Sequence, residues 1–416
     1  MRVLVVSDIE WSDDNSLGNT MSNLFLGNKE ISVASLYRRT SNPSNLLCKK
    51  YFRISYISIL KNFFKKEQIG EYFELEKPLS TKTEVTGEKK AIGLIHKLKL
   101  NKLVYFIEDM LFATKKWENK KYKKFLEEFN PDIIFSFAKA SKTQLLFEKN
   151  ILKHLKNCKK ATFVVDDIYG ANQNKKYKKI IAEQLNLASK VYYITPSLRD
   201  EYKEIFGVDG DILTKGCDFS LPVIKKENPI KTIVYAGNLL YGRDNTLINL
   251  ANAINNHNKG NENKLYLKVY SPTLIDDTVK NALNINGASE FCGAKPFLEI
   301  VEILNKADLV LQVESFDKKQ QKIVKHSFST KITDCMQSGS VLFAIGPKEV
   351  ASMQAANDID GAFVAFSVEE ISDTIKQIAY ADLYKNAIKT REYAKEHFGI
   401  DKIQEKLVKD FKEIIK

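Results

Sequence analysis

Short runs of β-branched and aromatic residues alternate with longer segments of helical periodicity along most of this chain. Such an alternation is typical of parallel sheets built from β-α-β units. Strands are predicted at Arg2–Ser7, Ile31–Tyr37, Asp132–Phe137, Thr162–Val165 and Lys190–Thr195, and then at Thr232–Ala236, Leu265–Tyr270, Glu290–Gly293, Leu309–Val313, Val341–Ile345 and Ala362–Phe366. Helices are predicted between them, among others at Tyr122–Phe129, Lys175–Ala188, Leu247–Asn256, Pro296–Asn305 and Thr330–Ser338. The pattern predicts an α/β protein.

The alternation is interrupted near Asp218–Lys231, a stretch that lacks periodicity and contains Pro222 and Pro229. A chain of 416 residues is also too long for one ordinary core. We therefore predict two doubly wound, Rossmann-like domains that face a cleft, over residues 1–218 and 231–390, followed by a helix over residues 391–416. In such sheets, ligands bind at the carboxyl ends of the strands.

Cysteine and histidine spacing argues against a disulfide framework and against a structural zinc site. The five cysteines are far apart and form no CxxC pair, and the five histidines are equally scattered. No apolar run approaches the roughly 18–20 residues that span a bilayer. The run Val3–Val6 is too short for a signal-peptide core of about 7–15 residues. The expected location is the cytoplasm.

The charge balance is basic, with 64 Lys and Arg against 52 Asp and Glu and a formal net charge of +12. Such a surface attracts nucleic acid, anionic lipid or phosphorylated substrates, unless it only reflects a lysine-rich composition. One stretch, Tyr51–Lys66, is either an interfacial helix on an anionic membrane or a core helix with a solvated lysine face. Its basic side chains are Arg53, Lys61, Lys65 and Lys66, and its candidates for apolar insertion are Ile59, Phe63 and Phe64.

The segment Ile233–Leu247 has the form of a strand, a glycine-containing loop and a helix that is predicted to begin near Asn245 and Thr246. Gly237 and Gly242 let the backbone approach a ligand closely, and the helix N-terminus offers N–H groups and a positive dipole to phosphate. Arg243 adds donors that match phosphate oxygens. It is expected at the surface, where it contributes little to the core. The loop is neither GxGxxG nor a Walker motif, and a packing turn is the alternative.

A second segment, Val313–Gly339, places polar residues at the start of a helix. Ser329 and Thr330 offer hydroxyl and N–H groups to phosphate, and Lys331 adds charge. Asp334 lies about one turn further, on the face of Thr330, where a carboxylate accepts hydrogen bonds from a ribose diol. The alternative is an N-capped surface helix.

These segments together resemble the family 4-like glycosyltransferases of bacterial surface polysaccharide assembly, which have the GT-B fold. Ile194–Tyr202 resembles the late strand and helix of the N-terminal domain, and Lys215–Asp218 resembles its closing Asn-Gly-Val-Asp turn. Gly237–Arg243 resembles the diphosphate loop of a subgroup, and His326–Gly339 aligns with the Glu-x7-Glu donor signature. The resemblance covers the chain from about residue 130 to 370.

The resemblance implies an enzyme that moves a sugar, with retention, from a nucleotide-diphosphate sugar to a saccharide acceptor, without a cofactor. It also implies that the C-terminal helix crosses back to the N-terminal domain. The candidates for the donor diphosphate are Gly237, Asn238, Arg243, Ser329, Thr330, Lys331 and Gly18, and the candidate for the ribose is Asp334.

The chain departs from the family at several of these positions. His326 stands where the family has its first glutamate, which contacts the donor sugar, and Asp334 stands for the second. The family has an arginine and a lysine after the diphosphate-loop glycine. Here Asn238 follows Gly237, so this pair of cations is not present in the family's form. Arg243 and Lys331 are the candidates to replace it.

Acceptor chemistry is expected at Asp166 and Asp167, which follow the predicted strand Thr162–Val165. A carboxylate there would orient an acceptor hydroxyl or stabilise positive charge on the sugar ring, and a helix N-cap is the alternative. The catalytic candidates are therefore Asp167, which we favour, Asp166 and His326. Gly18, in the predicted loop after the first strand, is placed to approach the donor phosphates.

Two further classes of function stay open. A catalytically idle GT-B partner subunit would keep the fold, and His326 in place of glutamate favours it. A nucleic-acid-binding protein would use the net charge, although no RRM, KH, helix-turn-helix or zinc signature is present and no nucleic-acid partner is expected. Asp358-Ile359-Asp360 is literally a DxD motif of metal-dependent glycosyltransferases, but we interpret it as a turn, so no metal is expected.

The expected acceptor is a polyprenyl-diphosphate-linked saccharide in capsule, exopolysaccharide or O-antigen assembly. The protein is then expected to lie peripherally on the anionic inner face of the cytoplasmic membrane.

Overall fold

The computed structural model of this chain describes residues 1–12, 15–76, 101–170, 173–220, 222–224 and 228–416, without the side chains of residues 101–105. It divides into two compact units, which we call the N-terminal and the C-terminal domain. The N-terminal domain comprises Met1–Tyr193, Arg199–Leu213 and Gln404–Lys416. The C-terminal domain comprises Ile194–Leu198 and Thr214–Ile403. Within the predicted interruption Asp218–Lys231, Leu221 and residues 225–227 lie outside the described residues.

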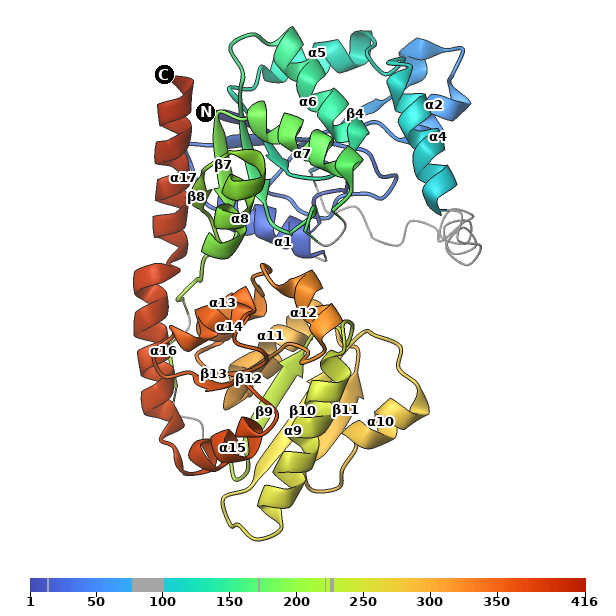
Figure 1. Cartoon of the computed structure of the whole chain (residues 1–416). Coiled ribbons are helices and arrows are strands. Elements are labelled where there is room, and N and C mark those ends of the chain that lie inside the picture. The colour runs from blue at the N-terminus through green and yellow to red at the C-terminus, as the bar shows by residue number, and fades with distance from the viewer. Residues whose placement is uncertain (13–14, 77–100, 171–172, 221, 225–227) are drawn as a thin grey trace. The chain divides into compact units, whose positions relative to one another are not determined.

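The N-terminal domain contains an eight-stranded sheet in the order β4-β3-β2-β1-β5-β6-β7-β8. Figure 1 labels β4, β7 and β8 of this sheet. Its strands are β1 (Arg2–Ser7), β2 (Ser32–Tyr37), β3 (Lys50–Arg53), β4 (Glu71–Glu74), β5 (Ile133–Phe137), β6 (Lys159–Val164), β7 (Lys190–Tyr193) and β8 (Asp211–Ile212). All pairs are parallel except β3 with the edge strand β4. The strand order reverses between β1 and β5, which makes their carboxyl ends the topological switch point of the sheet.

Helices cover both faces of this sheet. They are α1 (Ser16–Phe25), α2 (Tyr56–Lys61), α4 (Asn101–Ala113), α5 (Lys120–Phe129), α6 (Lys142–His154), α7 (Lys175–Asn186), α8 (Pro196–Phe206) and α17 (Ile400–Ile415), with a 3-10 turn at Lys66–Gln68. On one face an aromatic core forms, in which the rings of Trp117 and Phe147 meet edge to face at 4.6 Å. On the other, Phe135 of β5 contacts Phe25 of α1 and Phe411 of α17.

The C-terminal helix crosses back to the N-terminal domain, as predicted. Gln404 of α17 donates through Nε2 to the carbonyl groups of Asn23 (2.9 Å) and Leu26 (2.8 Å) at the end of α1. The hydroxyl of Tyr192 in β7 donates to Asp410 of α17 at 3.0 Å. These bonds tie the last helix of the chain to the first sheet.

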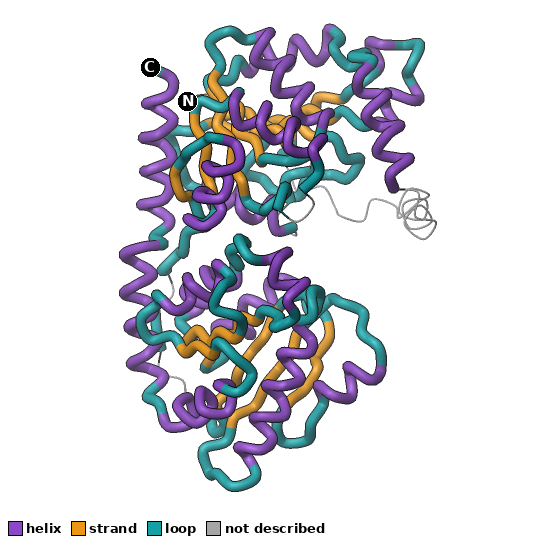
Figure 2. Tube along the Cα trace, in the orientation of Figure 1, coloured by secondary structure: helices purple, strands orange, loops and turns teal. Residues whose placement is uncertain are grey.

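The C-terminal domain contains a six-stranded, fully parallel sheet in the order β11-β10-β9-β12-β13-β14. Its strands are β9 (Lys231–Ala236), β10 (Leu265–Tyr270), β11 (Ser289–Gly293), β12 (Leu309–Val313), β13 (Val341–Ile345) and β14 (Phe363–Ala365). Its helices are α9 (Arg243–Asn258), α10 (Asp277–Leu283), α11 (Phe297–Lys306), α12 (Lys318–Val324), α13 (Lys331–Ser338), α14 (Ala351–Asn357), α15 (Glu370–Tyr380) and α16 (Leu383–His397). Figure 2 shows these strands in orange and the helices in purple. The switch point lies between β9 and β12.

The stretch Tyr51–Lys66 is not the single helix that we expected. Tyr51 and Phe52 are fully buried in β3, where the register pairs Tyr51 with Ser35 of β2. Arg53 is tied to Glu71 by an ion pair (Nη2–Oε2 2.6 Å), and Ile59 of α2 is buried in the core. The interpretation as one interfacial helix is therefore wrong, because sheet pairing takes up the first half of the stretch.

The interpretation of Asp358-Ile359-Asp360 as a turn is confirmed. Ile359 is buried, while both aspartates are exposed in a turn after α14. Gly361 follows with a φ of +83°, and a Cβ there would lie 2.3 Å from the carbonyl oxygen of Asn386. The motif therefore closes a packed turn.

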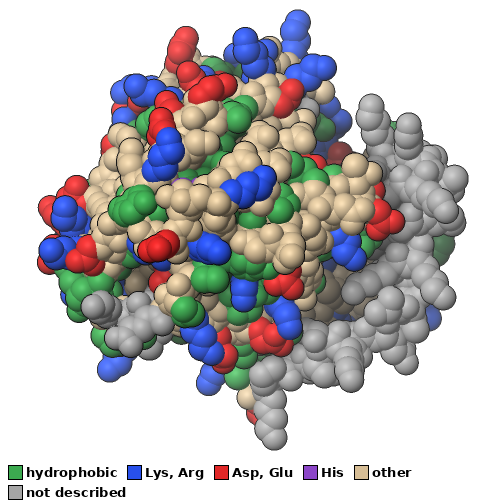
Figure 3. Space-filling model, turned by 90° about the horizontal axis from the view of Figure 1, so that it is seen from below, with side chains coloured by type: hydrophobic (Ala, Val, Ile, Leu, Met, Phe, Trp, Pro, Cys, Tyr) green, Lys and Arg blue, Asp and Glu red, His purple; other side chains and the backbone are tan. Residues whose placement is uncertain are grey.

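No helix within the described part of the chain has the length and apolar character needed to cross a membrane. On the face drawn in Figure 3, Lys and Arg side chains are interspersed with Asp and Glu and form no single basic patch.

Candidate functional site

The candidate site of the C-terminal domain lies at the carboxyl edge of its sheet, where the loop after β9 meets the start of α13. Gly237 is the first residue of this loop. A Cβ at Gly237 would lie 2.2 Å from Cε and 2.9 Å from Nζ of Lys331. The glycine therefore makes room for the Lys331 side chain and brings two predicted site residues together.

The helix after this loop begins earlier than predicted. It starts at Arg243, with Gly242 as its N-cap at φ +75° and without a side-chain cap bond. A Cβ at Gly242 would also lie 2.6 Å from Oγ of Ser315. The left-handed backbone and the close packing both select glycine, and they start the helix two residues before Asn245.

Arg243 is buried, with 8% of its surface exposed, so the expectation of a surface arginine is wrong. Its Nε donates to the Val313 carbonyl (3.1 Å) and to Glu314 Oε2 (3.2 Å), and its Nη2 donates to Glu314 Oε2 (3.0 Å). Its Nη1 donates to Oδ1 of Asn238 at 2.7 Å. Arg243 thus joins the end of β12 to the loop after β9.

Glu314, which we did not select as a site residue, is the centre of a buried polar network. Its side chain is 2% exposed, and Gln312 donates to its Oε1 at 2.8 Å. Gln312 in turn accepts a hydrogen bond from the Ser329 hydroxyl at 2.7 Å. Burial raises the pKa of Glu314, while the charges of Arg243 and Lys331 oppose that rise. The Ser329 hydroxyl therefore already donates its hydrogen bond within this network.

Lys331 differs from its neighbours because its ammonium makes no hydrogen bond or ion pair with any residue that the structure describes. It is the first residue of α13, after the N-cap Thr330, whose side chain makes no cap bond. Burial first, and then the charge of Arg243, lower the pKa of Lys331 to about 8, against the opposing charges of Glu314 and Asp334. This cation lies at a helix N-terminus, beside a glycine loop.

Asp334 and His326 have partners of their own. The Asp334 carboxylate forms an ion pair with Lys215, with Nζ and Oδ1 2.5 Å apart. His326 is 4% exposed, and its Nδ1 lies 3.0 Å from the Ser197 hydroxyl. The Thr195 hydroxyl donates to the His326 carbonyl at 2.9 Å.

Asp166 and Asp167 follow β6, at the carboxyl edge of the N-terminal sheet. Asp167 Oδ1 accepts from the Gly170 amide at 2.7 Å, which closes a local turn. Burial raises the pKa of Asp166, the charge of Lys139 lowers it and that of Asp167 raises it.

A charged cluster that we did not predict lies at the switch point of the same sheet. Arg38, directly after β2, forms ion pairs with Asp8 after β1 (2.5 Å) and with Glu108 of α4 (3.1 Å). Lys139, after β5, lies 3.6 Å from Asp8. Burial would raise the pKa of Asp8, but the charges of Arg38 and Lys139 hold it below its ordinary value. Each of Asp8, Arg38 and Lys139 follows the end of a parallel strand, and this is the signal that could have identified them.

Gly18 lies in the first turn of α1 and not in the loop where we expected it. Its amide donates to Oδ1 of the N-cap Asn15 at 2.7 Å. A Cβ at Gly18 would lie 2.0 Å from the Ser12 carbonyl oxygen. The structure thus explains this glycine by helix packing.

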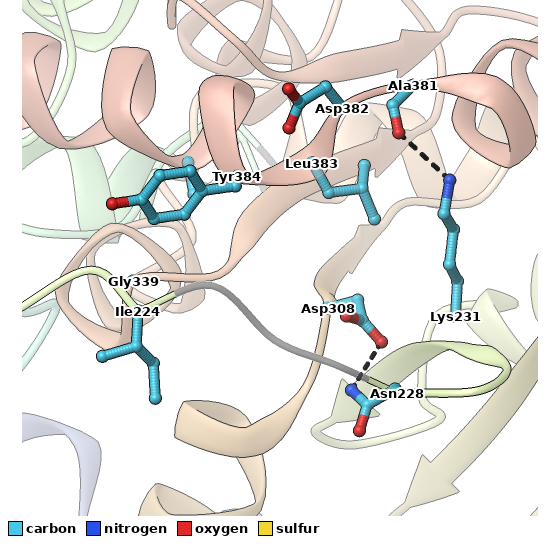
Figure 4. A pocket seen from close by; sticks show the side chains of 10 residues that line it. Ile224, Asn228, Lys231, Asp308, Gly339, Ala381, Asp382, Leu383 and Tyr384 are labelled. Carbon is cyan, nitrogen blue, oxygen red and sulfur yellow. Dashed lines mark hydrogen bonds between the residues drawn. The ribbon is translucent and has the colours of Figure 1, made fainter.

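A small pocket of about 200 Å³ opens at the opposite, amino edge of the C-terminal sheet (Figure 4). Lys231 donates there to the carbonyl groups of Ile378, Ala379 and Ala381 at the end of α15. Asp308 accepts from Asn228 at 2.8 Å. These groups terminate α15 and anchor the start of β9, and none of the predicted site residues lines the pocket.

No protein-family model and no curated protein matches the chain. Solved structures do match over its whole length. A glycosyltransferase from Rickettsia africae matches with a TM-score of 0.64 at 12% identity, over 100% of this chain and 99% of that one. HepE from Anabaena, in complex with UDP and glucose, matches with a TM-score of 0.62 at 10% identity, over 99% and 100%. The α,α-trehalose 6-phosphate synthase of Burkholderia multivorans matches with a TM-score of 0.60 at 9% identity, over 99% and 98%. The chain therefore has the two-domain GT-B fold.

Proposed function

We propose that this protein is a glycosyltransferase that moves a sugar from a nucleotide-diphosphate sugar to a saccharide acceptor. The observation that carries the proposal is the Lys331 ammonium, which lies beside Gly237 at the N-terminus of α13 and makes no hydrogen bond or ion pair with a described residue. Such a site suits the diphosphate of a donor, since a cation and the positive end of a helix dipole stabilise the charge of the leaving group. Structures of the same fold hold UDP, as HepE does.

We assign the remaining contacts with the donor to residues at the same carboxyl edge of the C-terminal sheet. Asp334 would accept from the ribose diol, with its other oxygen held by Lys215. His326, oriented by Ser197, would face the donor sugar in place of a glutamate. Lys331 and the helix N-termini would meet the diphosphate charge without a metal ion, and we propose retention of configuration from the resemblance.

The acceptor would bind in the N-terminal domain, at the carboxyl edge that carries Asp166 and Asp167. Either carboxylate would orient an acceptor hydroxyl, and the charges of Asp8, Arg38 and Lys139 line the same edge. We propose a polyprenyl-diphosphate-linked saccharide of surface polysaccharide assembly as the acceptor, from the resemblance.

The first prediction concerns the nucleotide. We expect one of UDP, GDP, ADP, TDP and CMP to stabilise the full chain in a thermal-shift screen, because only the matching base completes the site. A ligand at 100 times its dissociation constant adds about 2.7 kcal/mol. The corresponding nucleotide sugar should then be turned over with a saccharide acceptor.

Three results, from this screen, from a turnover assay and from a binding assay with duplex nucleic acid, would contradict the proposal. Nucleotide binding without turnover of any donor would favour the idle partner subunit, which the histidine at position 326 also favours. Binding of duplex nucleic acid with a steep salt dependence would favour the nucleic-acid-binding alternative. If none of the five nucleotides stabilised the chain, the proposed donor site would be wrong.

We further propose attachment to an anionic membrane through α2, α4 and the residues that follow α2. The two helices pack against each other (Figure 1). Apolar side chains are exposed on both helices. The exposed apolar side chains are Leu60, Phe64, Phe106, Ile107 and Met110. Lys61 and Lys65 are exposed beside them, and each basic side chain near an anionic surface adds about 1 kcal/mol.

The second prediction tests this surface by co-sedimentation with vesicles of varied anionic-lipid content. The variant Phe64→Ser/Phe106→Ser should bind at least several-fold more weakly than wild type, because it removes inserted apolar area. Leu274→Ser is the matched control, since Leu274 is 99% exposed in the C-terminal domain and lies outside this surface. Wild type that ignores anionic vesicles at low salt, or equal losses in both variants, would contradict membrane attachment.

A further inference from the structure

We propose that Lys331 is the cation that binds the donor diphosphate, and that Arg243 is a positioning residue that shapes the loop after β9 and does not touch the phosphate. This inference rests on the proposed function, because it assigns roles within the donor site. It departs from our sequence-based expectation that the two cations share the phosphate contact.

Each of the three nitrogens of the Arg243 guanidinium already donates at least one hydrogen bond. A guanidinium has five N–H donors, and Nε and Nη2 of Arg243 point to Glu314 and the Val313 carbonyl. Nη1 donates to Asn238 at 2.7 Å. To turn its Nε and Nη2 donors toward a phosphate, Arg243 would have to leave a carboxylate that is itself buried, which is strongly unfavourable.

The bond from Arg243 to Asn238 fixes the shape of the loop. Asn238 Oδ1 accepts from Arg243 Nη1 and also from the Leu240 amide at 3.2 Å. The Tyr235 hydroxyl donates to the Asn238 carbonyl. The turn at residues 238–240 is thus held through both the side chain and the carbonyl of Asn238, and Gly237, the first residue of the loop, lies directly against Lys331.

Lys331 has the opposite character. Its ammonium makes no hydrogen bond or ion pair within the described part of the chain. It lies over the ring of Tyr235, 5.7 Å from the centroid, and the charges of Arg243, Glu314 and Asp334 act on it. Its pKa of about 8 means that the free protein loses this charge as the pH rises through about 8. A bound polyanion stabilises the protonated form, so its binding and proton uptake are coupled. Affinity for such an anion should be highest below pH 8 and should fall above it.

The test is calorimetric titration of the full chain with inorganic pyrophosphate between about pH 6.5 and 9.5. Lys331→Met should bind about tenfold or more weakly at pH 7, because it loses a charge-assisted contact. Lys331→Arg should keep most of the affinity and lose the fall in affinity near pH 8, since arginine stays protonated throughout. The Lys331→Met curve also shows how much of the pH dependence belongs to pyrophosphate itself.

Asn238→Ala separates the two roles without breaking the buried pair of Arg243 and Glu314. It frees Nη1 of Arg243 and releases the turn. If Arg243 only positions the loop, this variant should bind pyrophosphate more weakly while keeping the wild-type pH profile. If Arg243 is a ligand, the freed donor should preserve or raise the affinity.

The inference is overturned if wild type does not bind pyrophosphate, if Lys331→Met keeps the wild-type affinity and profile, or if Asn238→Ala does not weaken binding. These failures differ from failure of the proposed function. A chain that binds pyrophosphate through Lys331 but turns over no nucleotide sugar would keep the roles of Lys331 as the phosphate-binding cation and of Arg243 as a positioning residue, and would lose the proposed function.

Discussion

Lys160→Met is expected to lower the free energy of unfolding of the N-terminal domain by about 3–5 kcal/mol, because it leaves a buried carboxylate without its counter-ion. Lys160 of β6 and Glu148 of α6 form an ion pair (Nζ–Oε2 3.0 Å), and both side chains are 0% exposed. Burial lowers the pKa of Lys160, and the charge of Glu148 opposes that fall. Tryptophan fluorescence during urea unfolding measures the effect, since Trp11 and Trp117 both lie in this domain.

The chain offers a matched control at Lys149, the residue next to Glu148. Lys149, also on α6, pairs with Glu183 of α7 at 2.5 Å, but its side chain is 48% exposed. Lys149→Met should therefore cost no more than about 1 kcal/mol. The double variant Glu148→Met/Lys160→Met should recover most of the loss, since an apolar pair of similar volume replaces the ions. Equal effects of Lys160→Met and Lys149→Met would contradict the prediction.

This ion pair also reaches the proposed acceptor edge. Lys160 donates to the Gln184 carbonyl at 2.6 Å, and Oε1 of Gln184 accepts from the Lys139 amide at 3.0 Å. Lys139 in turn lies beside Asp8 at the switch point. We therefore expect loss of the Lys160–Glu148 ion pair to weaken acceptor binding as well as to lower stability.

Several of the strands that the sequence pattern identified, among them β5, β12 and β13, are buried on both faces along their whole length. Val341–Ile345 and Leu309–Val313 are continuous apolar runs, and the structure places both within the bounds that we predicted. The sequence did not reveal β3, β4 or β8. β4 is an edge strand with exposed glutamates, and β8 has two residues, so pairing with distant partners decides both.

The features of the site that depend on neighbouring residues in the sequence could be predicted. Those that depend on ion pairs between distant residues could not. The start of α13 was predicted from the residue types that helix starts prefer, and Thr330 is its N-cap, although the Thr330 side chain makes no cap bond. The burial of Arg243 does not follow from such rules, because its partner Glu314 is 71 positions away in the sequence. Nor does the ion pair of Lys215 with Asp334, which are 119 positions apart.

The second large effect is expected at Arg243, where we predicted from the sequence that loss of the side chain would leave the fold intact. Arg243→Met should lower the stability of the C-terminal domain by about 3–5 kcal/mol, because Glu314 then remains charged and unpaired at 2% exposure. Amide hydrogen exchange measured on peptides from β9 and β12 reports on this domain alone. Protection in both strands should fall, since Arg243 joins the ends of these strands.

Lys331→Met is the control, because it removes a cation from the same edge of the sheet. The pKa of Lys331 falls to about 8 on folding, so the folded state disfavours its charge, and the variant should keep or raise the stability. Arg243→Met/Glu314→Leu should recover most of the loss, since it removes both members of the buried pair. If Arg243→Met instead kept full protection from hydrogen exchange and lost only nucleotide affinity, Arg243 would be a surface ligand. The proposed positioning role of Arg243 would then be wrong.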